Sequence, residues 1–372
     1  MKSVIRVLHI MPNYSIGGIN RYVMDLCTAL NECDGIQADI FVLNGETGPW
    51  KELVARKTSN VYEGDFRPMD IRFSRIKAFS EIKAKYDIVN WHIPFPTLMM
   101  TCIGDSKCHV YTHHSILGAG RKQSAMAPLK WKLFKIIINT VFDAQVFNSN
   151  FTRKFWKSRG LYTRKEELVY NPIVPLMTSE ESGGLLEKWP QLGTKFVVGT
   201  ACSMVGWKRL NLLIDACAEF FCYDSEAVLL LVGDGPEREC LEVKVREKNI
   251  QDKVIFSGFQ PEVVDFIQVM DVFVSTSVGE TFGLAVGEAM SLGKPAICFS
   301  DGGGVCEVVG SESGNIVSDS LALAERLAYY SELKRRQGSC ESAAYEDRVK
   351  IFSMQMVVEK YIELYEKLIN CA

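Results

Sequence analysis

Short apolar runs recur along the chain, separated by polar loops and by segments with helical periodicity. Residues 4–10, VIRVLHI, form the first run, and the loop MPNYSIGG follows it. A helix is then expected with Ile19, Val23, Leu26 and Leu30 on one face. Similar runs follow at 38–43, 87–93, 109–114 and 144–148. Strand-like runs that alternate with helical segments are typical of a parallel sheet with helices on its faces.

The same alternation begins again after residues 171–193, where three prolines and three glycines interrupt the periodicity. Strand-like runs are found at 195–201, 227–233, 253–258, 271–277 and 295–300. We therefore expect an α/β protein with two doubly wound, Rossmann-like domains, residues 1–172 and 194–352, joined by a linker at 173–193. Such sheets bind ligands at the carboxyl ends of their strands, so the site is expected in a deep cleft between the two facing domains.

Residues 353–372 read as a C-terminal amphipathic helix. Its apolar side carries Val358, Tyr361, Ile362, Tyr365 and Leu368. We expect this helix to cross back and pack on the N-terminal domain.

Composition adds the charge distribution and the compartment. The net charge of -3 hides 24 basic against 15 acidic residues in 1–172, and 18 against 30 in 173–372. The twelve cysteines include no C-x-x-C pair and are expected to be reduced, small apolar residues. No signal-peptide core and no apolar stretch near ~20 residues is present, which favours a cytoplasmic protein.

The segment 279–304, GETFGLAVGEAMSLGKPAICFSDGGG, carries the densest candidate chemistry. A helix is expected from Gly283 to Leu292, which puts Glu280 in the preceding loop and Glu288 inside the helix. The first-turn N–H groups favour an anion such as phosphate, and a carboxylate accepts hydrogen bonds from a vicinal diol. The pattern therefore predicts a sugar-nucleotide site; two solvated acids remain the alternative.

Segment 279–304 resembles the signature of the family 4 retaining glycosyltransferases. These enzymes have the GT-B fold and an E-x7-E motif with F-G between the acids. SIGGINRYVMDL, DIVNWH, VYTHH, VYNPI, GWKRL, LLLVGDGPERECLE, VIFSGF and SDGGGVCEVV resemble further family elements in the same order, over nearly the whole chain. The resemblance implies a hexosyltransferase that takes its sugar from a nucleotide-diphosphate sugar and retains the anomeric configuration.

The resemblance also implies residue roles. Glu280, His114 and Lys208 would be catalytic: Glu280 would bind hydroxyls of the transferred sugar, Lys208 would neutralise the diphosphate, and His114 would face the donor sugar. His113 could replace His114, and a structural role for this histidine pair is equally open. The other implied donor-binding residues are Gly17, Gly18, Arg209, Phe282, Gly283, Leu284 and Glu288, with Glu288 on the ribose.

One departure from the family pattern concerns positive charge near the diphosphate. The family arginine before the lysine loop is replaced by the turn Cys202-Ser203-Met204, and Arg209 stands where a glycine usually follows the lysine. Arg209 is predicted to supply the missing charge; the alternative is a surface arginine.

No D-x-D motif is present, so neither a metal nor another cofactor is expected, and Lys208 with the helix N-terminus would neutralise the leaving group. Residues 121–165 hold eleven Lys or Arg and one acid, interleaved with Trp131, Phe134, Phe155 and Trp156. This favours a glycan or lipid-linked acceptor and peripheral association with the anionic inner face of the plasma membrane, as in bacterial cell-surface polysaccharide synthesis. A merely solvated basic face is the alternative.

Other functions are less well supported by the residues. A nucleotide-sugar epimerase or a phosphorylase on the same fold, and a nucleotide-sugar-binding protein without catalysis, stay open. A dinucleotide oxidoreductase lacks its G-x-G-x-x-G, and no nucleic-acid-binding motif accompanies the basic segment.

Overall fold

The computed structural model describes residues 4–15, 17–46, 48–58, 60–67, 72–116, 127–176 and 183–370. The chain divides into two compact units. The first comprises the described residues up to Pro172 together with those from Phe352 onward, and the second runs from Ile173 to Ile351.

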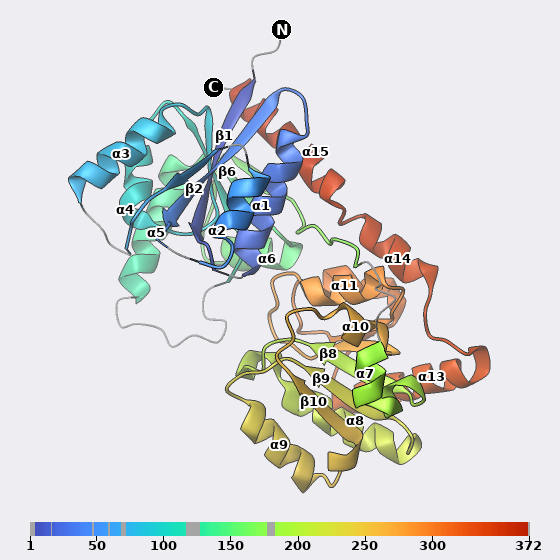
Figure 1. Ribbon diagram of the computed structural model, residues 1–372. Coiled ribbons are helices and arrows are strands. Elements are labelled where there is room, and N and C mark those ends of the chain that lie inside the picture. Colours follow the sequence, from blue (N-terminus) through green and yellow to red (C-terminus); the bar gives the residue numbers. More distant parts are fainter. Residues whose placement is uncertain are drawn as a thin grey trace. The chain divides into compact units, whose positions relative to one another are not determined.

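The first unit contains a seven-stranded parallel sheet in the order β3-β2-β1-β4-β5-β6-β7 (Figure 1). Its strands are β1 (Ile5–Asn13), β2 (Ile36–Asn44), β3 (Val61–Glu63), β4 (Ile88–Trp91), β5 (Cys108–His113), β6 (Ala144–Phe147) and β7 (Lys165–Leu168). Its helices are α1 (Gly18–Asn31), α2 (Lys51–Lys57), α3 (Phe73–Lys83), α4 (Pro96–Met99), the 3₁₀ turn η1 (Met100–Cys102), α5 (Ala127–Val141), α6 (Asn150–Lys157) and α15 (Met354–Ile369).

Both faces of this sheet are buried, because successive side chains of each strand point to opposite sides. On one face Val7 and Val110 pack against α1 and α15, and on the other Leu8 and Tyr111 pack with α3, α4 and α5. Figure 1 shows α1 and α15 together on one side of the sheet and α3 to α5 on the other.

Helix α15, at the end of the described chain, belongs to the core of the first unit. It buries Val357, Val358, Tyr361, Leu364, Tyr365 and Leu368. The Tyr361 hydroxyl lies 3.0 Å from that of Tyr22 on α1 and 3.1 Å from Thr112 Oγ1 on β5. Asn90 Nδ2 donates to the Tyr365 hydroxyl at 2.9 Å, so α15 satisfies polar groups that the sheet buries.

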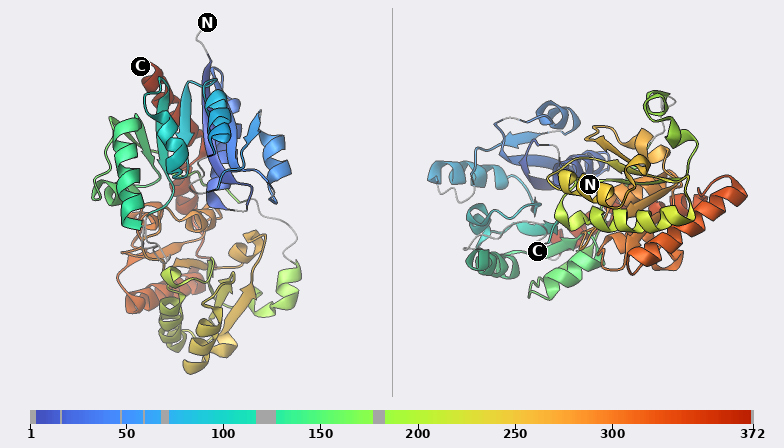
Figure 2. Two further views of the ribbon diagram at one scale, coloured as in Figure 1. Left: turned by 90° about the vertical axis from the view of Figure 1, so that its left-hand side faces the viewer. Right: turned by 90° about the horizontal axis from the view of Figure 1, so that it is seen from below.

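The second unit contains a six-stranded parallel sheet in the order β10-β9-β8-β11-β12-β13. Its strands are β8 (Val197–Ala201), β9 (Val228–Val232), β10 (Val254–Gly258), β11 (Val272–Ser275), β12 (Ala296–Phe299) and β13 (Ile316–Val317). Its α-helices are α7 (Gly183–Lys188), α8 (Leu210–Tyr223), α9 (Arg238–Glu247), α10 (Val264–Gln268), α11 (Leu284–Ser291), α12 (Val305–Val309), α13 (Ser320–Gln337) and α14 (Ala343–Lys350). Its 3₁₀ turns are η2 (Pro190–Gly193), η3 (Gly206–Lys208), η4 (Gln251–Lys253) and η5 (Ser311–Ser313). Helices α8, α9 and α13 cover one face, and both views in Figure 2 show the sheet between helices.

The two doubly wound, Rossmann-like sheets confirm the predicted fold class. Within the predicted linker, 173–193, residues 183–188 form α7 and residues 190–193 form η2, and residues 177–182 lie outside the described residues. Ile173 is buried and packs against Gly287 of α11, where a Cβ atom on the glycine would lie 2.1 Å from Ile173 Cδ1. The second unit therefore begins directly after Pro172.

Candidate active site

The loop that carries Glu280 is held by backbone hydrogen bonds to the glycine run after β12. The N–H of Glu280 donates to Gly302 O at 2.8 Å, and the Glu280 carbonyl accepts from the N–H of Gly304 at 2.7 Å. Glu280 and Gly303 thus form an isolated parallel β-bridge beyond the strands proper. The loop of Glu280 and the glycine run after β12, both in segment 279–304, therefore position each other.

Two glycines of this arrangement cannot carry a side chain without displacing backbone or core atoms. Gly283 precedes α11 with φ 102°, and a Cβ on it would lie 2.7 Å from Val305 Cγ2. A Cβ on Gly304 would lie 2.1 Å from Thr281 O. These contacts explain the F-G and G-G-G sequences by close approach of the two loops.

Lys208 and Glu280 form an ion pair at this position, 2.5 Å from Nζ to Oε2. Both side chains are largely buried, with 17% and 18% of their surface exposed. Lys208 ends η3, where Thr276 Oγ1 donates to its carbonyl at 2.8 Å, and its Nζ lies 4.1 Å from the centre of the Trp207 ring. Two predicted catalytic residues, 72 positions apart, are thus brought together just before α11.

Apart from Arg209, the remaining predicted residues of the second unit lie on α11 or at its start. Phe282 is buried, so its side chain is a core residue and only its backbone could meet a ligand. Leu284 is 36% exposed at the first position of the helix. Glu288 lies half-buried one turn further on, and its carbonyl accepts from Ser291 Oγ at 2.7 Å.

Arg209 is engaged within the second unit. Its guanidinium donates to both carboxylate oxygens of Asp301, at 2.8 and 2.6 Å, and to the carbonyls of Thr276 and Ser277, at 2.8 and 3.3 Å. These hydrogen bonds and the positive charge hold the pKa of Asp301 below its usual range. The residue adopts the left-handed conformation, φ 50°, which explains why glycine is usual at this position.

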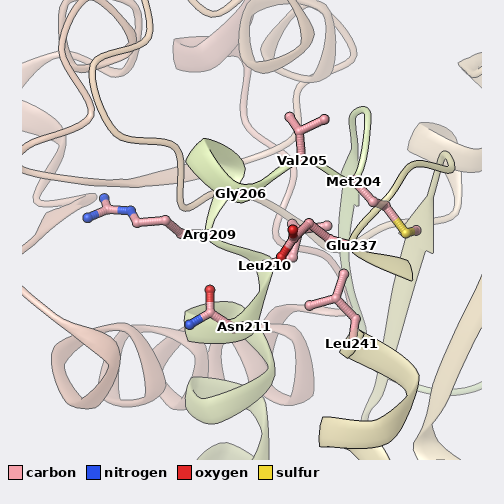
Figure 3. A pocket seen from close by; sticks show the side chains of 8 residues that line it. All are labelled: Met204, Val205, Gly206, Arg209, Leu210, Asn211, Glu237 and Leu241. Carbon is pink, nitrogen blue, oxygen red and sulfur yellow. The ribbon is translucent and has the colours of Figure 1, made fainter. Parts of the chain in front are cut away.

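The loop without the family arginine packs against the G-D-G-P turn. A Cβ on Gly233 would lie 2.0 Å from Cys202 O, and one on Gly235 would lie 2.4 Å from Met204 O. Ser203, where the arginine would stand, is exposed. Figure 3 shows the pocket beside this loop, lined by Met204, Val205, Gly206, Arg209, Leu210, Asn211, Glu237 and Leu241. The Arg209 side chain points away from Leu210 and Glu237 in that view.

In the first unit His114 follows β5 and belongs to a row of three hydrogen-bonded histidines. His92 Nδ1 lies 2.8 Å from His114 Nε2, and His92 Nε2 lies 2.9 Å from His9 Nδ1. Burial lowers the pKa of His114 to about 3, so its ring is neutral at pH 7. Tyr22 of α1 packs edge-on against the His114 ring, with centroids 4.7 Å apart.

His113, the alternative catalytic histidine, is a core residue. It is 2% exposed, stacks on Phe147 and lies 2.8 Å from Gln145 Oε1. Burial lowers its pKa to about 3. Of the two neighbours, His113 thus has the structural environment, and His114 is the more exposed.

Gly17 and Gly18 lie where β1 passes into α1. Gly17 precedes the helix in an extended conformation, and no heavy atom lies within 4 Å of a Cβ built on either glycine. Asn20 Nδ2 donates to Ser15 O at 2.8 Å and so ties the loop to the first turn of α1.

The basic segment 121–165 differs in part from its predicted arrangement, and its residues 121–126 lie outside the described residues. The expectation of interfacial aromatic side chains is wrong for Phe134 and Trp156, because both are buried in the core of the first unit. Helix α5 instead exposes the apolar residues Leu133 and Ile136, at 40% and 51%. The aromatic residues alternate with lysines in the sequence because the buried and the exposed sides of the helix alternate along it.

The described residues contain neither a metal-binding cluster nor a membrane-spanning helix. Within the ranges listed above, no three His, Cys, Asp or Glu side chains gather in a way that could hold a metal ion. None of the helices seen there is long and apolar enough to span a bilayer.

Two parallel-sheet, Rossmann-like units of this kind are the architecture of the GT-B class of glycosyltransferases. The family model Glycosyltransferase Family 4 matches residues 16–175, and Glycosyl transferases group 1 matches residues 186–347. The chain belongs to glycosyltransferase family 4.

The similar proteins include sugar transferases of several specificities. O-antigen chain mannosyltransferase C of Escherichia coli is 25% identical over 98% of this chain and 99% of its own. The D-rhamnosyltransferase WbpZ of Pseudomonas aeruginosa is 25% identical over 87% and 85%. The crystal structure of Anabaena Alr3699/HepE in complex with UDP is similar with a TM-score of 0.79 and 18% identity, covering 98% of this chain and 100% of that one.

Three residues of these arrangements were not singled out from the sequence. Asp301 could have been noticed as an acid next to the glycine run. His9 lies within β1 and His92 directly follows β4, but only the register of the sheet brings them to His114.

Proposed function

We propose that the protein transfers a sugar from a nucleotide-diphosphate sugar to a glycan or lipid-linked acceptor, with retention of configuration and without a metal ion. The ion pair of Lys208 and Glu280 at the start of α11 is the observation that carries this proposal. It holds a cation and a hydrogen-bond acceptor for hydroxyls 2.5 Å apart, on two loops that meet, and the Glu280 loop is held by backbone hydrogen bonds.

In the proposed reaction the bound donor replaces the ion pair between Lys208 and Glu280 with its own contacts to each residue. The diphosphate takes the Lys208 ammonium, and sugar hydroxyls donate to the Glu280 carboxylate, which stays in place through its backbone bonds to Gly302 and Gly304. Lys208 and the N-terminus of α11 stabilise the charge that develops on the leaving diphosphate. The departing phosphate oxygen accepts the acceptor's proton on the same face of the sugar, and no protein nucleophile takes part.

The other implied donor contacts follow from the same placement. Glu288, one turn along α11, binds the ribose hydroxyls, and the backbone at Phe282, Gly283 and Leu284 meets the diphosphate and sugar. Gly17 and Gly18 keep the loop before α1 free of side chains so that it can approach the donor, and His114 binds the transferred sugar. Arg209 acts on the donor through its bonds to Asp301, Thr276 and Ser277, which hold the Lys208 loop.

The acceptor belongs to surface-polysaccharide assembly in this proposal. The matched relatives from Escherichia coli and Pseudomonas aeruginosa are named as sugar transferases, the former of the O-antigen chain. The solved Anabaena structure contains UDP, which supports a nucleotide donor without fixing the base for this chain.

Thermal shift with a panel of UDP-, GDP- and ADP-sugars, followed by NMR of the product's anomeric proton, tests the proposal. We expect one nucleotide class to stabilise the protein, the donor's configuration in the product, and activity that survives EDTA. Lys208→Ala and Glu280→Gln should each lower kcat by about 100-fold or more. The control is Lys244→Ala, which removes a comparable lysine from its pair with Asp215 at 2.8 Å on another part of the same unit.

The same assays separate the alternatives. Isomerised donor without acceptor would indicate an epimerase, and binding without transfer or hydrolysis would indicate a binding protein. Inverted configuration, or full activity of Lys208→Ala, would refute the mechanism.

We further propose that the first unit touches the inner face of the plasma membrane through α5, where Leu133 and Ile136 are exposed beside Lys132. Apolar insertion and attraction of lysines to anionic lipid would act together. Liposome flotation tests this: Leu133→Ser with Ile136→Ser should reduce recovery with anionic vesicles, whereas Val243→Ser, an exposed apolar residue on α9, should not. Equal recovery with neutral and anionic vesicles would contradict the electrostatic part.

A further inference from the structure

Three histidines of the first unit form one continuous hydrogen-bonded row. His9 lies on β1, His92 directly follows β4, and His114 directly follows β5. The His9 and His92 rings are 5.2 Å apart with planes 17° from parallel, and the His92 and His114 rings are 5.1 Å apart with planes at 29°. His9 and His92 are 0% and 2% exposed, so their rings exchange hydrogen bonds with each other rather than with water.

The row permits only two arrangements of protons when all three rings are neutral. A neutral imidazole carries one N–H and one bare nitrogen, and both nitrogens of His92 are engaged. If His92 donates from Nδ1, His114 accepts at Nε2 and must carry its own hydrogen on Nδ1, while His9 donates from Nδ1. If His92 donates from Nε2, every proton moves to the opposite nitrogen, and His114 carries its hydrogen on Nε2.

The far end of the row distinguishes the two arrangements. His9 Nε2 is buried, and no group of the described residues forms a hydrogen bond with it. In the first arrangement this atom is a bare acceptor, and in the second it is an N–H donor without an acceptor. Buried donors without partners are the rarer of the two in proteins, which favours the first arrangement.

We propose that His92, backed by His9, is a positioning residue that fixes His114 in the tautomer with hydrogen on Nδ1. His114 therefore acts as a hydrogen-bond donor from Nδ1 and not as a base, and its ring is held by the hydrogen bond to His92 and by the edge of Tyr22. The Tyr22 hydroxyl is itself tied to that of Tyr361 at 3.0 Å, so α1 and α15 support the ring. The consequence for catalysis rests on the proposed transferase function; the tautomer itself does not.

The neutral state of the row agrees with its surroundings. Burial lowers the pKa of His9 to about 3 and places that of His92 well below its usual value. The aromatic groups that face these rings are Tyr22 from α1 and Tyr365 from α15, both with raised pKa and therefore uncharged at pH 7.

Nitrogen-15 NMR of histidine-labelled protein at pH 7.5 tests the proposal without donor or acceptor. The chain has five histidines, so the His114 signals can be assigned by substitution. We expect hydrogen on Nδ1 in the wild type. His92→Phe should release His114 toward the other tautomer and lower kcat by about tenfold or more, whereas His92→Asn, which keeps a donor for His114 Nε2, should restore both.

The control variant is His109→Asn, which alters a buried histidine near the start of β5 and should leave the His114 spectrum and kcat unchanged. Hydrogen on Nε2 of His114 in the wild type would overturn the proposal, and this spectrum decides even if a variant does not fold. An unchanged His114 tautomer in folded His92→Phe would overturn it as well. Failure of the transferase function alone would leave the spectra as expected and remove only the effect on kcat.

Discussion

Mild acid should destabilise the first unit and spare the second. All five histidines lie in the first unit, and burial lowers the pKa of His9, His113 and His114 to about 3, that of His109 to about 4, and that of His92 well below its usual value. Their folded pKa values are lower than those of the unfolded chain. Below about pH 6.5 the histidines of the unfolded chain therefore bind protons, whereas those of the folded unit stay neutral. The free energy of unfolding falls as the pH falls.

The size of the effect follows from the number of buried rings. At pH 5.5 each histidine lowers the free energy of unfolding by about 1.4 kcal/mol relative to pH 7.5, because the pH is then one unit below the pKa of the imidazole in the unfolded chain. Five rings give roughly 7 kcal/mol, which is comparable to the whole unfolding free energy of a typical domain. The second unit contains no histidine, and the carboxyl groups that hold it titrate only at lower pH.

Urea denaturation followed by pulsed hydrogen exchange and mass spectrometry can assign each transition to its unit. We expect the urea midpoint of peptides from the first unit to fall sharply between pH 7.5 and 5.5, and that of residues 195–350 to stay nearly constant. His109→Asn should remove about one fifth of the pH dependence. A first unit that keeps its midpoint, or a second unit that loses as much, would refute the reasoning.

Four further predictions concern single positions. Arg209→Ala should cost the second unit about 2 kcal/mol through the lost hydrogen bonds, and Arg209→Gly should cost about 1 kcal/mol less because glycine accepts φ 50° freely, as measured by calorimetric melting. If Arg209 acts through the loop, Asp301→Asn will weaken donor binding as Arg209→Ala does; unchanged affinity in Asp301→Asn would instead indicate direct contact with the diphosphate. Gly304→Ala should abolish transfer and destabilise by about 2 kcal/mol or more, whereas Gly184→Ala, in open space on a helix, should be neutral or stabilising; an active Gly304→Ala would contradict the close-approach argument. Tyr361→Phe should cost about 1–3 kcal/mol by leaving buried polar partners unsatisfied, which urea unfolding of the first unit would measure, and a change under 0.5 kcal/mol would speak against it.

The alternation of apolar runs predicted ten of the strands, because central parallel strands are buried on both faces and read as continuous apolar segments. The edge strands β3, β7 and β13 were missed. β7, Lys-Glu-Glu-Leu, has no apolar pattern, since it is exposed enough to carry three charges. Backbone pairing with β6 alone defines it as a strand.

The acidic and lysine residues of the site could be predicted as a set, but their contacts could not. Glu280 and Lys208 meet because two loops at neighbouring strand ends converge, which the spacing along the chain does not encode. The same holds for Arg209. Its charge predicted a role at the diphosphate, which stays a prediction, but its contact with Asp301 is revealed only by the fold.

Helix α15 also has a consequence for how the chain is made. The first unit's sheet is synthesised early, yet the helix that covers Tyr22, Asn90 and Thr112 is translated only after the whole second unit. Until then the nascent chain carries an incomplete apolar face and unpaired polar groups, a state prone to aggregation. The first unit can therefore complete its fold only after residues 173–351 have been made, and its two parts meet across the whole length of the second unit in the sequence.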